Sequence, residues 1–224
     1  MRYRLILICF FILCTFLSSG LNYDKKIDNM EIKNIVSDTI VKQDTILDVN
    51  GKVSLFIGDS HTANHHWGWQ MLLCDKTGMK MNNTAVGGKI TSWMIGVAKE
   101  SIHSGIDYCF IWGGANDMYG SVKATKAVEN IQQIVNICNL NGVKPIVLTG
   151  FDAKTCCVTP NNPGYPKRYA EFQQMLLDSI EGAKVLDTRV VVRKDCGDAI
   201  CHMNPSGHKK ISESVIKQMN FKIK

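Results

Sequence analysis

The chain has 224 residues, of which 45% are hydrophobic and 21% charged, and this average composition excludes disordered, collagen-like and long coiled-coil proteins. Its length suits one domain of ordinary size. The formal net charge of +6 is scattered in basic runs no longer than two residues, so we expect no nucleic-acid binding through a basic patch.

The first twenty residues are typical of an export signal. A basic start at residues 1–4 precedes an apolar run from Leu5 to Leu17, and small residues follow at 18–20. As a helix this run would span about 20 Å, which is less than the roughly 30 Å hydrocarbon core of a membrane. We therefore predict a signal peptide over 1–20 and a secreted or periplasmic protein, with no stable membrane span after cleavage. An uncleaved N-terminal anchor is the alternative.

Residues 21–51 are polar and rich in Asp and Lys, which indicates an arm or linker, and regular apolar patterning begins at Lys52. From there short apolar runs alternate with helical spacings. The patterning predicts strands at 53–57, 79–86, 108–112, 145–148 and from 184, and helices at 61–77, 91–103, 122–140, 168–180 and 206–219. Strands that alternate with helices indicate a parallel sheet covered on both faces. We therefore predict an α/β fold, a three-layer α/β/α sandwich, over residues 52–224.

Polar residues follow the first three predicted strands. Ser60 comes directly after the first strand, Gly88 follows the second, and Asn116 follows the third. In a parallel sheet, ligands bind beyond the carboxyl ends of the strands, so these three residues should lie at one edge. A serine hydroxyl becomes a good nucleophile when a base takes its proton, and the oxyanion that forms needs hydrogen-bond donors. The Gly88 N–H and the Asn116 amide are candidates for those donors.

The base should come from another loop at the same edge. His202 lies after the fifth strand and just before the last helix, and Asp198 precedes it. A histidine with a preceding acid would complete a set of nucleophile, base and orienting carboxylate. Ser60, just before a predicted helix, should also lie near the positive end of that helix.

These residues resemble the four sequence blocks of the SGNH (GDSL-like) hydrolases. The blocks are Gly58-Asp59-Ser60, the Gly88 segment, Gly114-x-Asn116-Asp117 and the segment from His202 to Gly207, and their order is that of the family. The resemblance spans residues 53 to about 215. It implies a flavodoxin-like five-stranded parallel sheet, which agrees with the predicted strands. It also implies Ser60 as the nucleophile, His202 as the base, and an oxyanion hole formed by the Ser60 N–H, Gly88 and Asn116.

The sequence departs from the family pattern at two positions. The family usually has Asp three residues before its His, whereas Ala199 stands there and Asp198 lies four residues before. Either the loop bulges and Asp198 orients His202, or Ser60 and His202 act as a dyad. The second departure is His61, where the motif has Leu, and its alternatives are a solvated side chain or a role at the mouth of the site.

Aromatic and polar residues near the strand ends are candidates for substrate binding. We expect Asp59, His61, Trp112 and Tyr119 to line the pocket. A helix from residue 61 would place Trp67 and Trp69 about 10 Å or more from Ser60, so these two are assigned to the core or the flank. We expect no cofactor and no metal, because the cysteines and histidines lack a recognised ligand spacing.

An exported chain would expose its loop cysteines to an oxidising compartment. Cys109 and Cys138 lie in apolar patterns and are expected to be buried thiols. The candidates for a disulfide are the four cysteines in predicted loops, Cys156, Cys157, Cys196 and Cys201. We favour a bridge from Cys156 or Cys157 to Cys196 or Cys201. A local Cys196–Cys201 bond and the absence of a bond are the alternatives.

These observations predict an exported serine esterase that works through an acyl-Ser60 intermediate. Its expected partner is a small ester or an acylated glycan, with O-acetyl as the first choice of acyl group. The alternatives are a lipase-, lysophospholipase- or thioesterase-type hydrolase, an O-acetyltransferase, and a non-catalytic carbohydrate-binding module on the same fold.

Overall fold

The computed structural model describes residues 45–63, 67–156, 161–197 and 202–224, and the structural statements below concern these residues. Three predictions lie outside them: the signal peptide over 1–20, most of the arm over 21–51, and the placement of Asp198. Cys157 and Cys201 also lie outside the described residues. Within the described part, no helix is both long enough and apolar enough to cross a membrane.

The domain is built on one five-stranded sheet with the strand order β2-β1-β3-β4-β5, in which every neighbouring pair is parallel. The strands are β1 (Val53–Gly58), β2 (Lys80–Asn83), β3 (Tyr108–Trp112), β4 (Lys144–Leu148) and β5 (Lys184–Leu186). All five residues of β3 are buried, as expected for a central strand whose two faces are covered by helices. The predicted α/β fold is confirmed.

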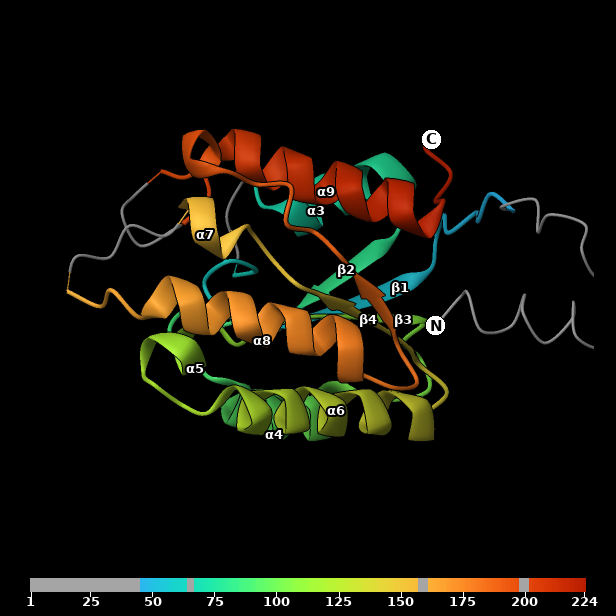
Figure 1. Ribbon diagram of the computed structural model, residues 1–224. Helices are drawn as coiled ribbons and strands as arrows, with labels where there is room; N and C mark the ends of the chain where they lie inside the picture. Colours follow the sequence, from blue (N-terminus) through green and yellow to red (C-terminus); the bar gives the residue numbers. More distant parts are fainter. Residues whose placement is uncertain (1–44, 64–66, 157–160, 198–201) are drawn as a thin grey trace, which may run out of the picture. The chain divides into compact units, whose positions relative to one another are not determined.

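Helices cover both faces of the sheet (Figure 1). The helices α3 (Trp69–Thr77) and α9 (Pro205–Met219) pack together on one face, and α4 (Thr91–Ser101), α6 (Ala124–Leu140) and α8 (Tyr165–Ser179) cover the other. Three short elements lie in the loops after strands: α5 (Ala115–Tyr119), α7 (Ala153–Cys156) and the 3₁₀ turn η1 (Arg193–Asp195). The three layers match the sandwich that the alternating pattern predicts.

The first described residues, from Thr45 onward, pack against the domain. Leu47 forms a parallel bridge with Phe221, and its N–H donates to the carbonyl of Asn220 at 2.9 Å. Val49 is buried in the core. The last residues of the predicted arm therefore lie against the C-terminal end of the chain.

The predicted helix over 61–77 is wrong at its start, because α3 begins at Trp69. The N–H groups of Thr62 and Ala63 instead donate to the carbonyl of Asp59, and the carboxylate of Asp59 accepts the N–H of His61. A side chain that bonds the backbone two residues ahead favours a turn over a helix. Ser60 therefore lies in a turn and not at the N-terminus of a helix.

The strand order places a crevice between β1 and β3. From β1 the chain crosses to β2 on one side, and from β3 it proceeds to β4 and β5 on the other. In such a sheet, ligands bind at the carboxyl ends of the two strands where the order reverses. Ser60 follows β1 and Asn116 follows β3, so both lie at this point.

Candidate active site

Ser60 and His202 meet although 142 residues separate them, with 2.9 Å between Ser60 Oγ and His202 Nε2. Ser60 lies in the turn after β1, and His202 lies just before α9. The histidine backbone is held from both sides: its carbonyl accepts the N–H of Gly197 at 2.7 Å, and the next residue, Met203, pairs with Cys196. The structure thus brings together the two residues that the sequence predicts as nucleophile and base.

The α9 helix begins directly after this loop for local reasons. Asn204 is its N-cap, with a side-chain oxygen that accepts the N–H of Gly207 at 3.2 Å, and Pro205 occupies the first turn. Gly207 lies so close to the carbonyl of Asp195 and the side chain of Met203 that a Cβ would collide with both. The cap and this close packing fix the place of the His202 loop relative to α9.

Gly88 and Asn116, the predicted oxyanion donors, line the same cavity as Ser60 and His202. This cavity has a volume of about 350 Å³, and its other lining residues are His61, Ala115, Tyr119 and Tyr165. Gly88 has a φ of 74°, and no atom lies within 4 Å of where its Cβ would be. Glycine is therefore needed there for its backbone conformation rather than for lack of space.

The segments that carry these two donors are tied together by a buried network. The carboxylate of Asp117 accepts the N–H of Thr91 at 2.9 Å and its hydroxyl at 2.6 Å. The amide of Asn130 in α6 donates to the same hydroxyl at 2.9 Å. Because Asp117 follows Asn116 and Thr91 begins the helix after Gly88, this network fixes one donor segment against the other.

The side chain of Asp59 lies beneath the site and is fully buried. Its Oδ1 accepts the N–H of His61 at 3.0 Å, and its Oδ2 accepts the Asn116 amide at 3.4 Å. The same amide nitrogen also donates to the carbonyl of Lys89 at 3.1 Å. Burial is the largest influence on this carboxyl group and raises the pKa of Asp59 to about 7.

Two of the residues predicted to bind substrate are too deeply buried to do so. Trp112 has no exposed surface, and its indole N–H donates to the hydroxyl of Tyr169 at 3.3 Å. Asp59 is equally inaccessible. Strand β3 turns the Trp112 side chain into the core, so its position at a strand end does not expose it. The predictions for Trp112 and Asp59 are corrected, whereas Tyr119 lines the cavity as predicted.

His61 belongs to the floor of the site. It is only 4% exposed, so the alternative of a solvated side chain is wrong. Its ring stacks on Trp112 with 5.4 Å between centroids and an interplanar angle of 14°, and lies 5.3 Å from the ring of His202. The turn at Asp59 directs this side chain inward. The predicted helix from residue 61 did not imply that orientation.

A second cavity of about 200 Å³ also reaches Ser60 and His202, and its other lining residues are His61, Trp67, Met203 and His208. Trp67 is 41% exposed, so the alternative that places it in the core is wrong, whereas Trp69 is buried as predicted. The reason is the late start of α3, which leaves Trp67 near the turn that holds Ser60. Tyr165 and His208 also line the two cavities and were not predicted from the sequence. His208 carries a signal in the sequence, since it directly follows the fourth block, six residues after His202.

Asp195 and Asp198 are the two acidic residues shortly before His202, and Asp195 is the one that the structure describes. Its Oδ2 accepts the Lys210 ammonium at 2.6 Å and the N–H of Val192 at 3.1 Å, and its Oδ1 accepts the hydroxyl of Ser206 at 3.0 Å. These bonds hold Asp195 against the first turns of α9. The predicted orienting residue, Asp198, lies outside the described residues.

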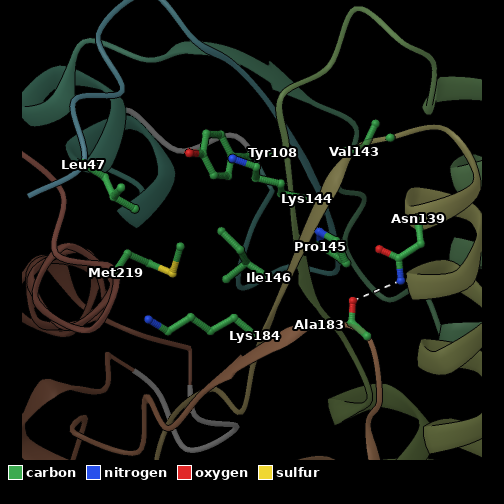
Figure 2. Close-up of a pocket in the computed structure, with 12 residues that line it drawn as sticks. Leu47, Tyr108, Asn139, Val143, Lys144, Pro145, Ile146, Ala183, Lys184 and Met219 are labelled. Atoms are coloured by element: carbon green, nitrogen blue, oxygen red, sulfur yellow. Dashed lines mark hydrogen bonds between the residues drawn. The ribbon is translucent and has the colours of Figure 1, made fainter. Parts of the chain in front are cut away.

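Another cavity, of about 560 Å³, lies at the opposite end of the sheet, where β3, β4 and β5 begin (Figure 2). Its lysines already have partners: the Lys184 ammonium donates to the carbonyl of Gln218 at 2.6 Å, and that of Lys144 lies 5.5 Å from the centre of the Tyr108 ring. None of the described residues that line it is a serine, cysteine or histidine. Among the described residues, no three His, Cys, Asp or Glu side chains gather as a metal site. Ser60 and His202 lie at the other end of the sheet, where the strands end.

The parallel sheet, with a serine–histidine pair and two oxyanion-donor candidates at its switch point, defines a serine hydrolase of the α/β class. A family model described as the GDSL-like lipase/acylhydrolase family matches residues 56–210. The chain belongs to this family and is an enzyme that hydrolyses ester bonds, which confirms the resemblance seen in the sequence. No curated protein sequence matches the chain.

Solved structures share the fold at low sequence identity. A member of the lipolytic protein G-D-S-L family from Veillonella parvula has a TM-score of 0.63 and 14% identity, and the match covers 75% of this chain and 97% of that one. A catalytic mutant of Axe2, an acetylxylan esterase from Geobacillus stearothermophilus, has a TM-score of 0.61 and 14% identity, with 79% and 98% covered. At these identities the likeness concerns the fold alone.

Proposed function

We propose that this hydrolase is an exported esterase that removes small acyl groups, acetyl above all, from a carbohydrate or another polar substrate. The observation that carries the proposal is the 2.9 Å contact between Ser60 Oγ and His202 Nε2 in a cavity also lined by Gly88 and Asn116. The predicted signal peptide supports export.

In the proposed mechanism, His202 Nε2 accepts the proton of Ser60 as Oγ attacks the ester carbonyl. The Ser60 and Gly88 N–H groups and the Asn116 amide then donate to the oxyanion. Collapse of this intermediate transfers the proton from His202 to the leaving alcohol and leaves an acyl-Ser60. Water, deprotonated by the same histidine, releases the acid and restores the serine.

We propose Asp198 as the residue that orients His202, because Asp195 is already bound to Lys210 and Ser206. The catalytic mutants of Axe2 replace a serine, an aspartate and a histidine, and the aspartate precedes the histidine by three residues. Ala199 holds that spacing in this chain. A Ser60–His202 dyad is the alternative, and comparison of Asp198→Ala with Asp195→Ala separates the two.

The proposed substrate follows from the size and lining of the site. A volume of about 350 Å³ is near the lower end for ligand cavities. The acyl group and the ester oxygen bound to it must both fit within this volume. Tyr119 and Tyr165 both line this space, and a tyrosine hydroxyl can donate to or accept from a polar substrate. The acetylxylan esterase Axe2, one of the structural neighbours, supports acetyl on a glycan as the first substrate to test.

The test is a series of p-nitrophenyl esters of increasing chain length, assayed beside acetylated xylan. We expect kcat/KM to be highest for acetate and to fall steadily with chain length, since the cavity is small. A maximum at long chains would contradict the proposed substrate and favour a lipase-type activity. If acetate is released from xylan no faster than from the p-nitrophenyl ester, the proposed substrate is limited to small esters and does not include acetylated xylan.

The assignment of Ser60 and His202 is tested by substitution. Ser60→Ala and His202→Ala should each lower kcat by several orders of magnitude, and the double variant should lose little more, because the two residues act as one unit. Ser104→Ala, at an exposed serine far along the chain, is the matched control and should keep full activity. Activity near the wild-type level in Ser60→Ala would overturn the mechanism.

A further inference from the structure

Two cysteines from distant parts of the chain meet beside the His202 loop. Cys156 ends α7 and Cys196 follows η1, and their Sγ atoms lie 2.8 Å apart although 40 residues separate them. The structure holds both as thiols. A disulfide bond measures about 2.05 Å, so the two sulfur atoms need to approach by only about 0.8 Å. We propose that Cys156 and Cys196 form a disulfide that fastens the His202 loop to α7.

One end of this bond would lie on a well-anchored element. The N–H of Cys156 donates to the carbonyl of Asp152 at 2.9 Å, and its thiol donates to the carbonyl of Val191 at 3.2 Å. Asp152 in turn donates its N–H to Val191 at 3.1 Å. The Cys156 side chain is fully buried. It therefore provides a fixed attachment point next to the carboxyl end of β4.

The other end lies on the strand-like segment that holds the catalytic histidine. Cys196 pairs with Met203, and the next residue, Gly197, donates its N–H to the carbonyl of His202. A restraint on Cys196 therefore acts on His202 through two backbone contacts. Since Cys196 touches neither cavity at Ser60, the bond would affect the position of the base and not the binding of substrate.

The difference in exposure between the two thiols determines which of them reacts first with an oxidant. Cys196 is partly exposed, whereas burial, with the neighbouring Cys196 thiol second, raises the pKa of the Cys156 thiol. The thiolate of Cys196 therefore attacks first, on a disulfide oxidant such as oxidised glutathione, and expels one glutathione thiolate. Cys156 then gives up its proton and attacks Cys196 Sγ, which expels the second glutathione. Two protein thiols lose two electrons, and one glutathione disulfide becomes two thiols.

The remaining described cysteines provide an internal contrast. Cys109 and Cys138 also neighbour each other, between β3 and α6, but both are fully buried in the core. Cys74 is buried beside the hydroxyl of Ser54 at 3.6 Å. A soluble disulfide oxidant has no access to these three side chains while the protein stays folded. Among the described cysteines, oxidation should therefore be confined to Cys156 and Cys196.

The first test is a map of the bond in the full-length protein. The protein is equilibrated in glutathione buffers from fully reducing to fully oxidising, unfolded in denaturant that contains iodoacetamide so that buried thiols are alkylated too, and digested without reduction. We expect a peptide pair joined through Cys156 and Cys196 that increases with the oxidised fraction. Alkylated Cys156 in the most oxidising buffer, or Cys196 joined to Cys201 instead, would overturn the proposal. This test involves no substrate, so it stands whether or not the esterase proposal holds.

The second test measures the consequence for the base, and it rests on the proposed function. Reduction should lower kcat severalfold with KM nearly unchanged, and should lower Tm by roughly 5–15 °C. The double variant Cys156→Ser/Cys196→Ser should match the reduced wild type and no longer respond to glutathione, whereas Cys74→Ser should respond like the wild type. A redox response of kcat that persists in the double variant, or a change in KM alone, would contradict a role in positioning His202.

Discussion

The Asn116 amide has two N–H groups, and both have an acceptor before any substrate arrives. One is the carbonyl of Lys89 at 3.1 Å, and the other is the carboxylate of Asp59 at 3.4 Å. The longer bond is the weaker one, because hydrogen bonds weaken with distance. An oxyanion can therefore replace Asp59 as the second acceptor, while the bond to Lys89 keeps the side chain in place.

This arrangement predicts a defect in catalysis rather than in binding when the amide is removed. Asn116→Ala should lower kcat about 10²–10³-fold, which corresponds to about 3–4 kcal/mol, with KM nearly unchanged. Steady-state kinetics on p-nitrophenyl acetate measure the two constants. Asn82→Ala, at an exposed position of β2, is the control and should leave both unchanged. A change in KM alone would place Asn116 in the substrate pocket instead.

Asp59 gives the protein a pH-dependent stability. Its pKa is about 7 in the folded protein against 3.8 for the ordinary group, so the folded state binds the proton more tightly. The contribution of this group to stability is fully present below about pH 4 and is lost as the pH rises towards 7. Asp59→Asn removes the titration while it keeps an oxygen for the His61 N–H.

Urea unfolding at pH 5 and pH 7 tests this prediction. Between these values the wild type should lose about 2 kcal/mol of unfolding free energy relative to Asp59→Asn. Contributions from all other groups cancel in the comparison of the two proteins. Parallel stability curves for the two proteins would show that Asp59 does not titrate in this range.

At the scale of the element, the short helix α5 depends on one glycine. Gly114 is its N-cap with a φ of 102°, and a Cβ at this position would run into the ring of Phe172 in α8. Gly114→Ala should therefore destabilise the protein by about 2 kcal/mol or more, since it adds backbone strain to a steric collision. Because Asn116 lies in α5, kcat should fall as well. Thermal unfolding and kinetics of the variant measure both effects.

Gly96 provides the matched control for this substitution. It lies exposed within α4, and no atom lies within 4 Å of where its Cβ would be. Gly96→Ala should therefore raise stability by up to about 1 kcal/mol, because alanine has the higher helix propensity. A similar loss of stability in both variants would show that the crowding at Phe172 is not the cause.

Strands with buried faces were predictable at this scale, and the segments between them were less so. The run of apolar residues in β3 appears in the sequence at its true bounds, since a strand buried on both faces must be apolar throughout. The turn after β1 was predicted as the first part of the helix over 61–77, although residues 61–66 are mostly polar. The hydrogen bond between the Asp59 carboxylate and the His61 N–H favours a turn here instead of a helix. This bond depends on side-chain geometry, which the spacing of apolar residues in the sequence does not reveal.

At the scale of the whole molecule, the sequence blocks predict the neighbours of Ser60 because each block follows a strand of one parallel sheet. That placement requires only the strand order and the common direction of the strands. The lining of the cavities by Trp67 and Tyr165 was not predictable in this way, because it depends on where α3 and α8 begin. The choice of Cys156 over Cys157 as the partner of Cys196 likewise needs the path of α7.

The two outer strands of the sheet are its shortest. β2 has four residues, of which Lys80, Met81 and Asn82 are exposed, and β5 has three. An outer strand with unpaired backbone groups invites another chain to extend the sheet, and short strands with lysine or polar residues discourage this. Both outer strands of this protein have a lysine, Lys80 or Lys184, at their first position. The short, lysine-bearing outer strands therefore discourage intermolecular β-pairing at both edges of the sheet.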